Sequence, residues 1–221
     1  MRIGTWNIDA RWGEQHEAFL QRHCCDVWLL TEVPPKAVHP PGTIAGYHAH
    51  LSEEVAVTGQ HWAAVLTQKP SSPVNTYLPA SVASVADGIT FCSSVLPWRT
   101  CNGYPPHPWV GNDFTEMAVN AIESLEQALP KSGLVWGGDW NQNLAGGDEA
   151  VGCYAGRDAL NLAVQRLRLR VTTAELPHQN PKCHTIDHIA IPQHWQSLPA
   201  EHISAVGLCT HDAYIVEVIR K

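Results

Sequence analysis

The chain has 221 residues, of which 44% are hydrophobic and 16% charged, and its formal net charge is −7 with histidine neutral. This length suits one large domain or two small ones. A chain of this length can bury a substantial core without disulfides or structural metal ions. The acidic balance argues against a nonspecific nucleic-acid coat protein, so a nucleic-acid substrate would need a local basic patch or a metal ion to offset the repulsion.

Cysteine usage and the N-terminus predict a soluble cytoplasmic protein. The seven cysteines include no C-x-x-C pair, so a structural zinc site of the finger type is not expected. An irregular zinc site formed by Cys24, Cys25 and Cys183 with nearby histidines remains an alternative. The segment MRIGTWNID lacks the features of a signal peptide. No run approaches the roughly 20 apolar residues of a membrane span, and we expect no membrane association.

The first half of the chain predicts strands with one early helix. Alternation in Arg2–Ile8 predicts a strand, and Gly13–His23 has the spacing of a short amphipathic helix. The continuous apolar run Asp26–Val33 is typical of a strand buried on both faces. His61–Gln68 and Gly88–Trp98 are the next predicted strands.

The second half alternates helices with strands. Proline-rich Cys101–Asp113 predicts a loop, and Thr115–Leu129 is the clearest helix, capped by Asp113 or Thr115. A second helix is predicted over Arg157–Leu167. The remaining predicted strands are Gly133–Asp139, Thr185–Ile191 and Ala213–Ile219. With no internal repeat and no dividing linker, residues 1–221 predict a single α/β domain.

Polar side chains gather at the ends of five predicted strands. They are Asn7 with Asp9, Glu32, Asp139 with Asn141, Asp187, and His211 with Asp212. Turns alone require fewer carboxylates, amides and imidazoles than this. Ionised groups at strand ends are unfavourable unless something pairs with them, and a divalent cation is the expected partner.

Five motifs, TWNID, LLTEV, GGDWNQN, TIDHI and THDAY, follow one another at these strand ends. In order and type they resemble the endonuclease/exonuclease/phosphatase superfamily, which has the deoxyribonuclease I-like fold. The resemblance spans residues 2 to 218 and implies a two-sheet β-sandwich flanked by helices in four layers, with the site at one open end.

The resemblance also implies a metal site and a phosphate site. Glu32 matches the carboxylate that binds Mg²⁺ or Mn²⁺, with Asn7 and Asp9 near the same ion. Asp139 and Asn141 match residues that contact the phosphate and the attacking or leaving oxygen. The two glycines before Asp139 are interpreted as letting these side chains approach a phosphate closely, while the turn aims them.

For the proton transfer, His211 matches the catalytic histidine and Asp187 the carboxylate that orients it. A histidine held in this way supplies a base near neutral pH for the attacking water. The amides of Asn7 and Asn141 are expected to bind the non-bridging oxygens of the phosphate as charge develops.

Two positions depart from the family pattern. The terminal Ser-Asp-His reads Cys-Thr-His here, so Thr210 replaces a carboxylate. An alternative register would instead use Asp212, but it needs a gap before the closing strand. The family's second acid–base residue is replaced by Val95, so Arg99, also a predicted phosphate ligand, or His107 would have to substitute.

Other polar residues are expected to be structural or solvated. His184 and His188 flank Asp187 and are predicted to be structural, and Trp140 is predicted to lie in the core. A predicted basic helix face is expected to be solvated, with Arg157 alone near the substrate. Its members are Arg157, Arg166, Arg168 and Arg170.

The sequence therefore predicts a monomeric Mg²⁺- or Mn²⁺-dependent phosphodiester hydrolase, most simply a DNA endo- or exonuclease. One alternative is a phosphatase or phosphodiesterase on a small phosphoester, which the negative net charge favours. Another is a catalytically silent scaffold with the same fold, which the substitutions at Thr210 and Val95 favour. The joint retention of five site residues argues against the scaffold.

Overall fold

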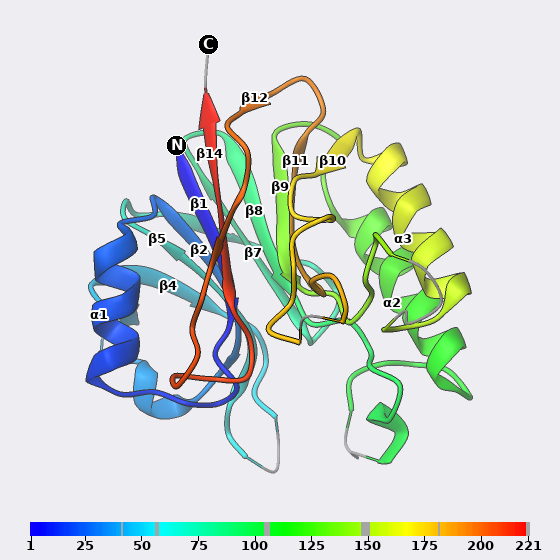
Figure 1. The fold of residues 1–221 in the computed structure, drawn as a ribbon, viewed down its shortest axis with the longest axis horizontal. Coiled ribbons are helices and arrows are strands. Elements are labelled where there is room, and N and C mark those ends of the chain that lie inside the picture. The colour runs from blue at the N-terminus through cyan, green and yellow to red at the C-terminus, as the bar shows by residue number, and fades with distance from the viewer. Residues whose placement is uncertain (41, 56–57, 104–106, 147–150, 181, 220–221) are drawn as a thin grey trace.

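The computed structural model describes residues 1–40, 42–55, 58–103, 107–146, 151–180 and 182–219. Figure 1 shows four layers, with α1 (Glu14–His23) outside the first sheet and α2 (Phe114–Ala128) and α3 (Tyr154–Arg166) outside the second. These are the helices of the described part, with short 3₁₀ turns η1 (Pro35–Ala37) and η2 (Cys101–Gly103). No helix among these residues is long and apolar enough to cross a membrane.

In the described residues the strands form two mixed sheets. The first sheet has the order β12-β14-β1-β2-β5-β4-β3, with β13 also paired to β14, and the second has the order β10-β11-β9-β8-β7-β6. The strands of the first sheet are β1 (Arg2–Asn7), β2 (Val27–Val33), β3 (Thr43–Ile44), β4 (Tyr47–Leu51), β5 (His61–Thr67), β12 (Gln196–Ser197), β13 (Glu201–Ile203) and β14 (Ala213–Ile219). Those of the second are β6 (Ser72–Val74), β7 (Ser81–Ala86), β8 (Ile89–Ser94), β9 (Leu134–Asp139), β10 (Leu169–Val171) and β11 (Asp187–Pro192).

Every strand and helix predicted from the sequence is present, but several strands were missed. The missed strands are β3, β4, β6, β7, β10, β12 and β13. Most of these have two or three residues, too few for a periodic signal, and β7 and β4 are rich in serine, alanine or histidine rather than in strong β-formers. Sheet pairing, rather than local preference, makes them strands.

The helix boundaries follow from their caps. Asp113 accepts a hydrogen bond from the Glu116 amide at 2.9 Å, which confirms one of the two predicted caps of α2. Helix α3 begins at Tyr154, earlier than predicted, where Cys153 Sγ accepts from the Gly156 amide at 3.3 Å. The predicted basic helix face is wrong in part: α3 ends at Arg166, so Arg168 and Arg170 lie beyond the helix.

Three hydrophobic clusters fill the spaces between the four layers. The middle cluster lies between the two sheets, and the outer clusters lie under α1 and under α2 with α3. Trp140 is fully buried and packs on Trp136 and His188, as predicted. Each sheet is therefore apolar on both faces, which explains the continuous apolar runs in the sequence.

The alternation of side chains determines which polar residues face the middle layer. The middle cluster contains Ile3, Val135 and Ile189. Ile3 and Val135 lie four residues before Asn7 and Asp139 in their strands, and Ile189 lies two residues after Asp187. Because side chains alternate along a strand, Asn7, Asp139 and Asp187 point into the same space between the sheets. The space between the sheets is therefore filled by apolar side chains along most of its length and by polar side chains at the end where Asn7, Asp139 and Asp187 lie.

The glycine pair before Asp139 serves sheet packing. A Cβ atom on Gly137 would collide with the His188 carbonyl oxygen and with Leu29. A Cβ atom on Gly138 would collide with the backbone of Ser94, and Gly138 has φ +117°. These contacts explain why both positions are glycine. The explanation is close packing within the protein, which differs from the close approach of a phosphate suggested by the sequence.

We expect Gly138→Ala to destabilise the fold more than Gly88→Ala. Both positions have positive φ, but a Cβ atom on Gly88 meets nothing within 4 Å. The unfavourable φ alone is worth about 1–3 kcal/mol, and Gly138→Ala adds the clash with Ser94. Urea unfolding of both variants measures the difference, and equal losses of unfolding free energy would contradict it.

Candidate active site

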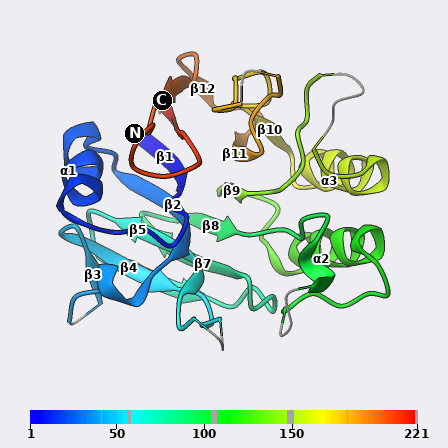
Figure 2. The same cartoon turned by 60° about the horizontal axis from the view of Figure 1, so that its bottom comes forward.

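The predicted site residues meet at one open end of the sandwich. Strands β1, β2 and β9 end there, and β11 and the segment before β14 begin there. Figure 2 turns this end toward the viewer. The residues brought together are Asn7, Glu32, Asp139, Asp187 and His211.

Asn7 joins two carboxylates from different sheets. Its side-chain amide donates to Glu32 Oε1 at 3.0 Å and to Asp139 Oδ2 at 2.9 Å, while its Oδ1 accepts from the Asp9 amide at 2.8 Å. Asn7 is 1% exposed. Both amide hydrogens go to carboxylates, so these contacts show a role in positioning. The predicted contacts of Asn7 with a phosphate and a metal ion stay predictions.

Glu32 reaches this space through an unusual backbone conformation. Regular alternation would place it with Leu30 on the side of α1, yet Val33 packs in that cluster instead. Glu32 has φ 55°, a left-handed value that is uncommon for a residue with a side chain. This turn of the backbone brings the carboxylate to Asn7.

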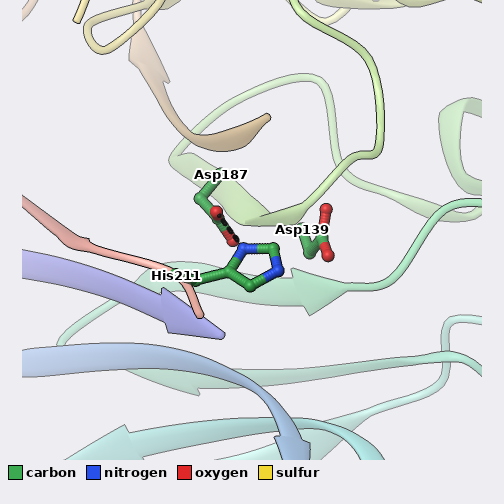
Figure 3. A group of neighbouring side chains, drawn as sticks. All are labelled: Asp139, Asp187 and His211. Carbon is green, nitrogen blue, oxygen red and sulfur yellow. Dashed lines mark hydrogen bonds and ion pairs between the residues drawn. The ribbon is translucent and has the colours of Figure 1, made fainter. Parts of the chain in front are cut away.

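His211 and Asp187 form a partly buried pair. The Nδ1–H group of His211 donates to Asp187 Oδ2 at 2.7 Å, and Asp187 is fully buried. In Figure 3 the other ring nitrogen of His211 lies on the side of Asp139. One ligand atom each from Asp139, Asp187 and His211 lies within 4.8 Å of the others. This geometry fixes the tautomer and the orientation of the imidazole.

Burial and mutual repulsion shift the pKa values of the cluster. Burial raises the pKa of Glu32, and burial together with the charge of Asp187 raises that of Asp139. Burial alone would lower the pKa of His211, but the charge and hydrogen bond of Asp187, with two further carboxylates, raise it. These shifts indicate that the metal-free site lacks enough positive charge to stabilise all of its carboxylates as anions.

The donor set fits a divalent cation. Asp139, Asp187 and His211 offer ligand atoms to one space, and the Asn7 amide links Glu32 to Asp139. Asp187 Oδ1 is buried without a hydrogen-bond partner among the described residues. Oxygen ligands with excess negative charge are those that Mg²⁺ and Mn²⁺ prefer. The one such group of potential ligands in the described residues contains no cysteine, so it gives no support to the irregular zinc site.

Asp9 and Thr210 adjoin the cluster. The Thr210 hydroxyl donates to Asp9 Oδ2 at 3.1 Å, and Arg11 forms an ion pair with the same oxygen at 3.1 Å. Asp212 instead points away, since its Oδ2 lies 2.6 Å from His202 Nε2. The geometry agrees with the register in which His211 is the site histidine.

The other predicted residues are tied to backbone carbonyls. Asn141, with φ 51°, donates from Nδ2 to the Leu96 carbonyl at 2.9 Å. Arg99 donates to the Gly152 carbonyl at 3.0 Å and has no hydrogen bond or ion pair to the cluster among the described residues. His107 Nδ1 lies 3.1 Å from the Trp109 carbonyl. Their roles toward a phosphate stay predictions.

Two histidines near Asp187 have different surroundings. His188 is buried between the Gln142 carbonyl and the Thr173 hydroxyl, at 2.9 and 3.2 Å, which confirms its predicted structural role. Burial lowers its pKa to about 4. Sequence reasoning missed His178, whose ring centroid lies 5.7 Å from that of His211. No local motif marks His178, because only the folding of its loop brings it to the site.

Comparisons with solved structures show the same fold. An AP endonuclease from Archaeoglobus fulgidus matches with a TM-score of 0.76 at 13% identity, covering 100% of both chains. An AP endonuclease from Leishmania major matches with a TM-score of 0.69 at 12% identity, covering 100% of this chain and 88% of that one. An endonuclease/exonuclease/phosphatase protein from Beutenbergia cavernae matches with a TM-score of 0.65 at 13% identity, covering 99% and 71%.

The sequence alone gives no such match. No protein-family model matches the chain. No curated protein matches it either. The four-layer sandwich predicted from the strand-end motifs is thus confirmed by structure, at identities that show the fold alone.

We expect Glu32→Gln to weaken Mn²⁺ binding by at least about 10–100-fold while the protein stays folded. That loss is typical even of an outer partner of a metal, and Glu32 lies at a strand end. Titration calorimetry with Mn²⁺ measures it, with Glu53→Gln, the same change at an exposed residue, as the control. Unchanged affinity in Glu32→Gln would remove Glu32 from the metal site.

We also expect the metal-free protein to lose stability as the pH rises from about 6.5 to 8. The raised pKa of His211 means that the folded state keeps a proton that the unfolded state, with a pKa of about 6.5, has released. This stability is complete below the unfolded pKa and falls above it, by up to about 1.4 kcal/mol per pH unit.

Urea unfolding with a chelator across this pH range measures the slope, and His211→Gln should flatten it. His48→Gln, at an exposed position, should keep the wild-type slope. Parallel curves for the wild type and His211→Gln would show that His211 holds no extra proton in the folded state.

Proposed function

Because the chain has the deoxyribonuclease I-like fold of the endonuclease/exonuclease/phosphatase proteins, we propose that it is a metal-dependent phosphodiester hydrolase. The observation that carries this proposal is the partly buried His211–Asp187 pair beside the carboxylates that Asn7 holds together. A fold hosts many functions, so the site, rather than the fold, supports the chemistry.

The histidine pair performs the proton transfer. Asp187 accepts from Nδ1–H of His211 and leaves Nε2 facing the space beside Asp139. From there Nε2 takes a proton from the attacking water, whose oxygen bonds to phosphorus as the bond to the leaving oxygen breaks. The proton then passes to the leaving oxygen, which restores the neutral imidazole.

The carboxylates supply the metal site. Glu32, with Asp9 and Asn7 beside it, would hold Mg²⁺ or Mn²⁺, and Asp139 with Asn141 would lie against the phosphate. When bound, the ion offsets negative charge on the phosphate and the carboxylates, which also lowers the pKa of His211 toward the neutral range that a base needs.

Nucleic acid, with DNA first, is the substrate we propose. Two of the solved structures with this fold are AP endonucleases, and their similarity covers the whole of this chain. A small phosphoester is the second candidate, favoured by the net charge of −7. The proposal includes one domain over residues 1–221, a monomeric state and a cytoplasmic location, as expected from the sequence.

A substrate panel with Mg²⁺ or Mn²⁺ tests the proposal. It comprises supercoiled DNA, single-stranded DNA, RNA and an aryl phosphodiester, each with and without chelator. We expect metal-dependent cleavage of DNA. Cleavage of the aryl diester alone would favour the small phosphoester, and no cleavage of any substrate would favour the silent scaffold.

In the same assay we expect Asp187→Asn to lower kcat by about 10²–10⁴-fold with KM nearly unchanged. The amide cannot stabilise the imidazolium or fix the tautomer as the carboxylate does. Asp158→Asn, an exposed change on α3, is the control. A variant that keeps wild-type turnover would argue against the His211–Asp187 pair as the base.

A further inference from the structure

His178 lies in a loop that is fastened to the segment carrying His211. The Tyr214 hydroxyl donates to the Pro177 carbonyl at 2.9 Å. Gln179 Nε2 donates to Asp212 Oδ1 at 3.1 Å and to the Cys209 carbonyl at 3.3 Å. These bonds flank His178 on both sides along the chain, so its backbone is fixed relative to the site.

The loop is also closed on itself. Pro177 pairs with His184 as an isolated antiparallel bridge, and the His178 amide donates to the Cys183 carbonyl at 3.1 Å. The Cys183 amide in turn donates to the Asn180 carbonyl at 3.2 Å. A loop with this many internal and external bonds presents its side chains in a defined position.

The ring of His178 stands edge-on to the ring of His211, with an angle of 75° and 5.7 Å between centroids. Its Nδ1 accepts from the Asn180 amide at 3.0 Å. In the neutral ring an accepting Nδ1 leaves the proton on Nε2. Among the described residues, Nε2 has no hydrogen-bond partner, and the ring is half-buried.

The surroundings keep this ring neutral. Burial lowers the pKa of His178, and the positive charge of His211 acts in the same direction, against Asp187 and Asp212. When His211 is protonated, a neutral His178 beside it avoids repulsion between like charges. His178 therefore offers one N–H donor beside the ring of His211.

We propose that His178 donates a hydrogen bond from Nε2 to a non-bridging oxygen of the phosphate that His211 serves. This inference rests on the proposed function. It assigns the second histidine of the site to the loop before β11, since Val95 is buried in the core and cannot fill that role. Arg99 and His107, the substitutes expected from the sequence, are each held by a backbone carbonyl.

Two variants of His178 distinguish the effect of its N–H donor from the effect of its aromatic ring. His178→Phe keeps an aromatic edge against His211 but removes the N–H group, whereas His178→Gln places an amide donor near the position of Nε2. His184→Phe makes the same change at the other end of the loop and serves as the control. The measurements are kcat/KM on aryl phosphodiesters with leaving groups of different pKa, and binding of inorganic phosphate to the Mn²⁺-loaded protein.

We expect His178→Phe to lower kcat/KM by about 10²–10³-fold, equally for all leaving groups, as when one donor to a developing charge is lost. It should also weaken phosphate binding, while His178→Gln retains most of both and His184→Phe retains all. Wild-type behaviour of His178→Phe would overturn the proposal. So would a loss that grows with the leaving-group pKa, which would indicate proton transfer to the leaving oxygen, or an equal loss in His184→Phe.

The two measurements also separate this inference from the proposed function. If the wild type hydrolyses no diester, the proposed function fails, and phosphate binding by the variants still decides the role of His178. If the wild type is active and His178→Phe matches it in both measurements, the inference about His178 alone fails.

Discussion

Two hydrogen bonds between the sheets, one buried and one partly buried, hold the site together. Asn7 of β1 donates to Asp139 of β9, and His211, just before β14, donates to Asp187 of β11. Each bond joins the first sheet to the second. Leaving such a buried group without its partner costs about 1–3 kcal/mol, and more when the group is charged. The same two hydrogen bonds therefore fix both the relative position of the sheets and the geometry of the site.

The same pairs explain how the fold tolerates so many acidic groups at one end of its core. Glu32 and Asp139 share the amide hydrogens of Asn7, while Asp187 is balanced by His211. This arrangement is sufficient for folding but leaves an excess of negative charge and an unpaired oxygen on Asp187. The excess is what suits the site to a cation, so the proposed use of a metal ion would follow from an incomplete balance of charges within the protein.

The sequence predicted the parts of the site that depend on alternation along a strand. Asn7, Asp139 and Asp187 share a face with apolar neighbours two or four residues away, and the strand-end motifs indicated the same fold. The orientation of Glu32 was not predictable, because it depends on a left-handed backbone. His178 was not predictable either, because its position depends on bonds between a loop and a distant segment. Local patterns carry no information about either feature.

Left-handed backbone occurs at several residues with side chains, and four of them lie at or beside the site. Glu32, Asn141, Asp9 and Ala10 all have φ near 50°. Glycine adopts this conformation without strain, so evolution toward higher thermal stability would be expected to favour glycine at Ala10, where no polar side chain is lost. At Glu32 and Asn141 the same relief would remove a functional group. Under the proposed function, relief of backbone strain at Glu32 or Asn141 would therefore exchange activity for thermostability.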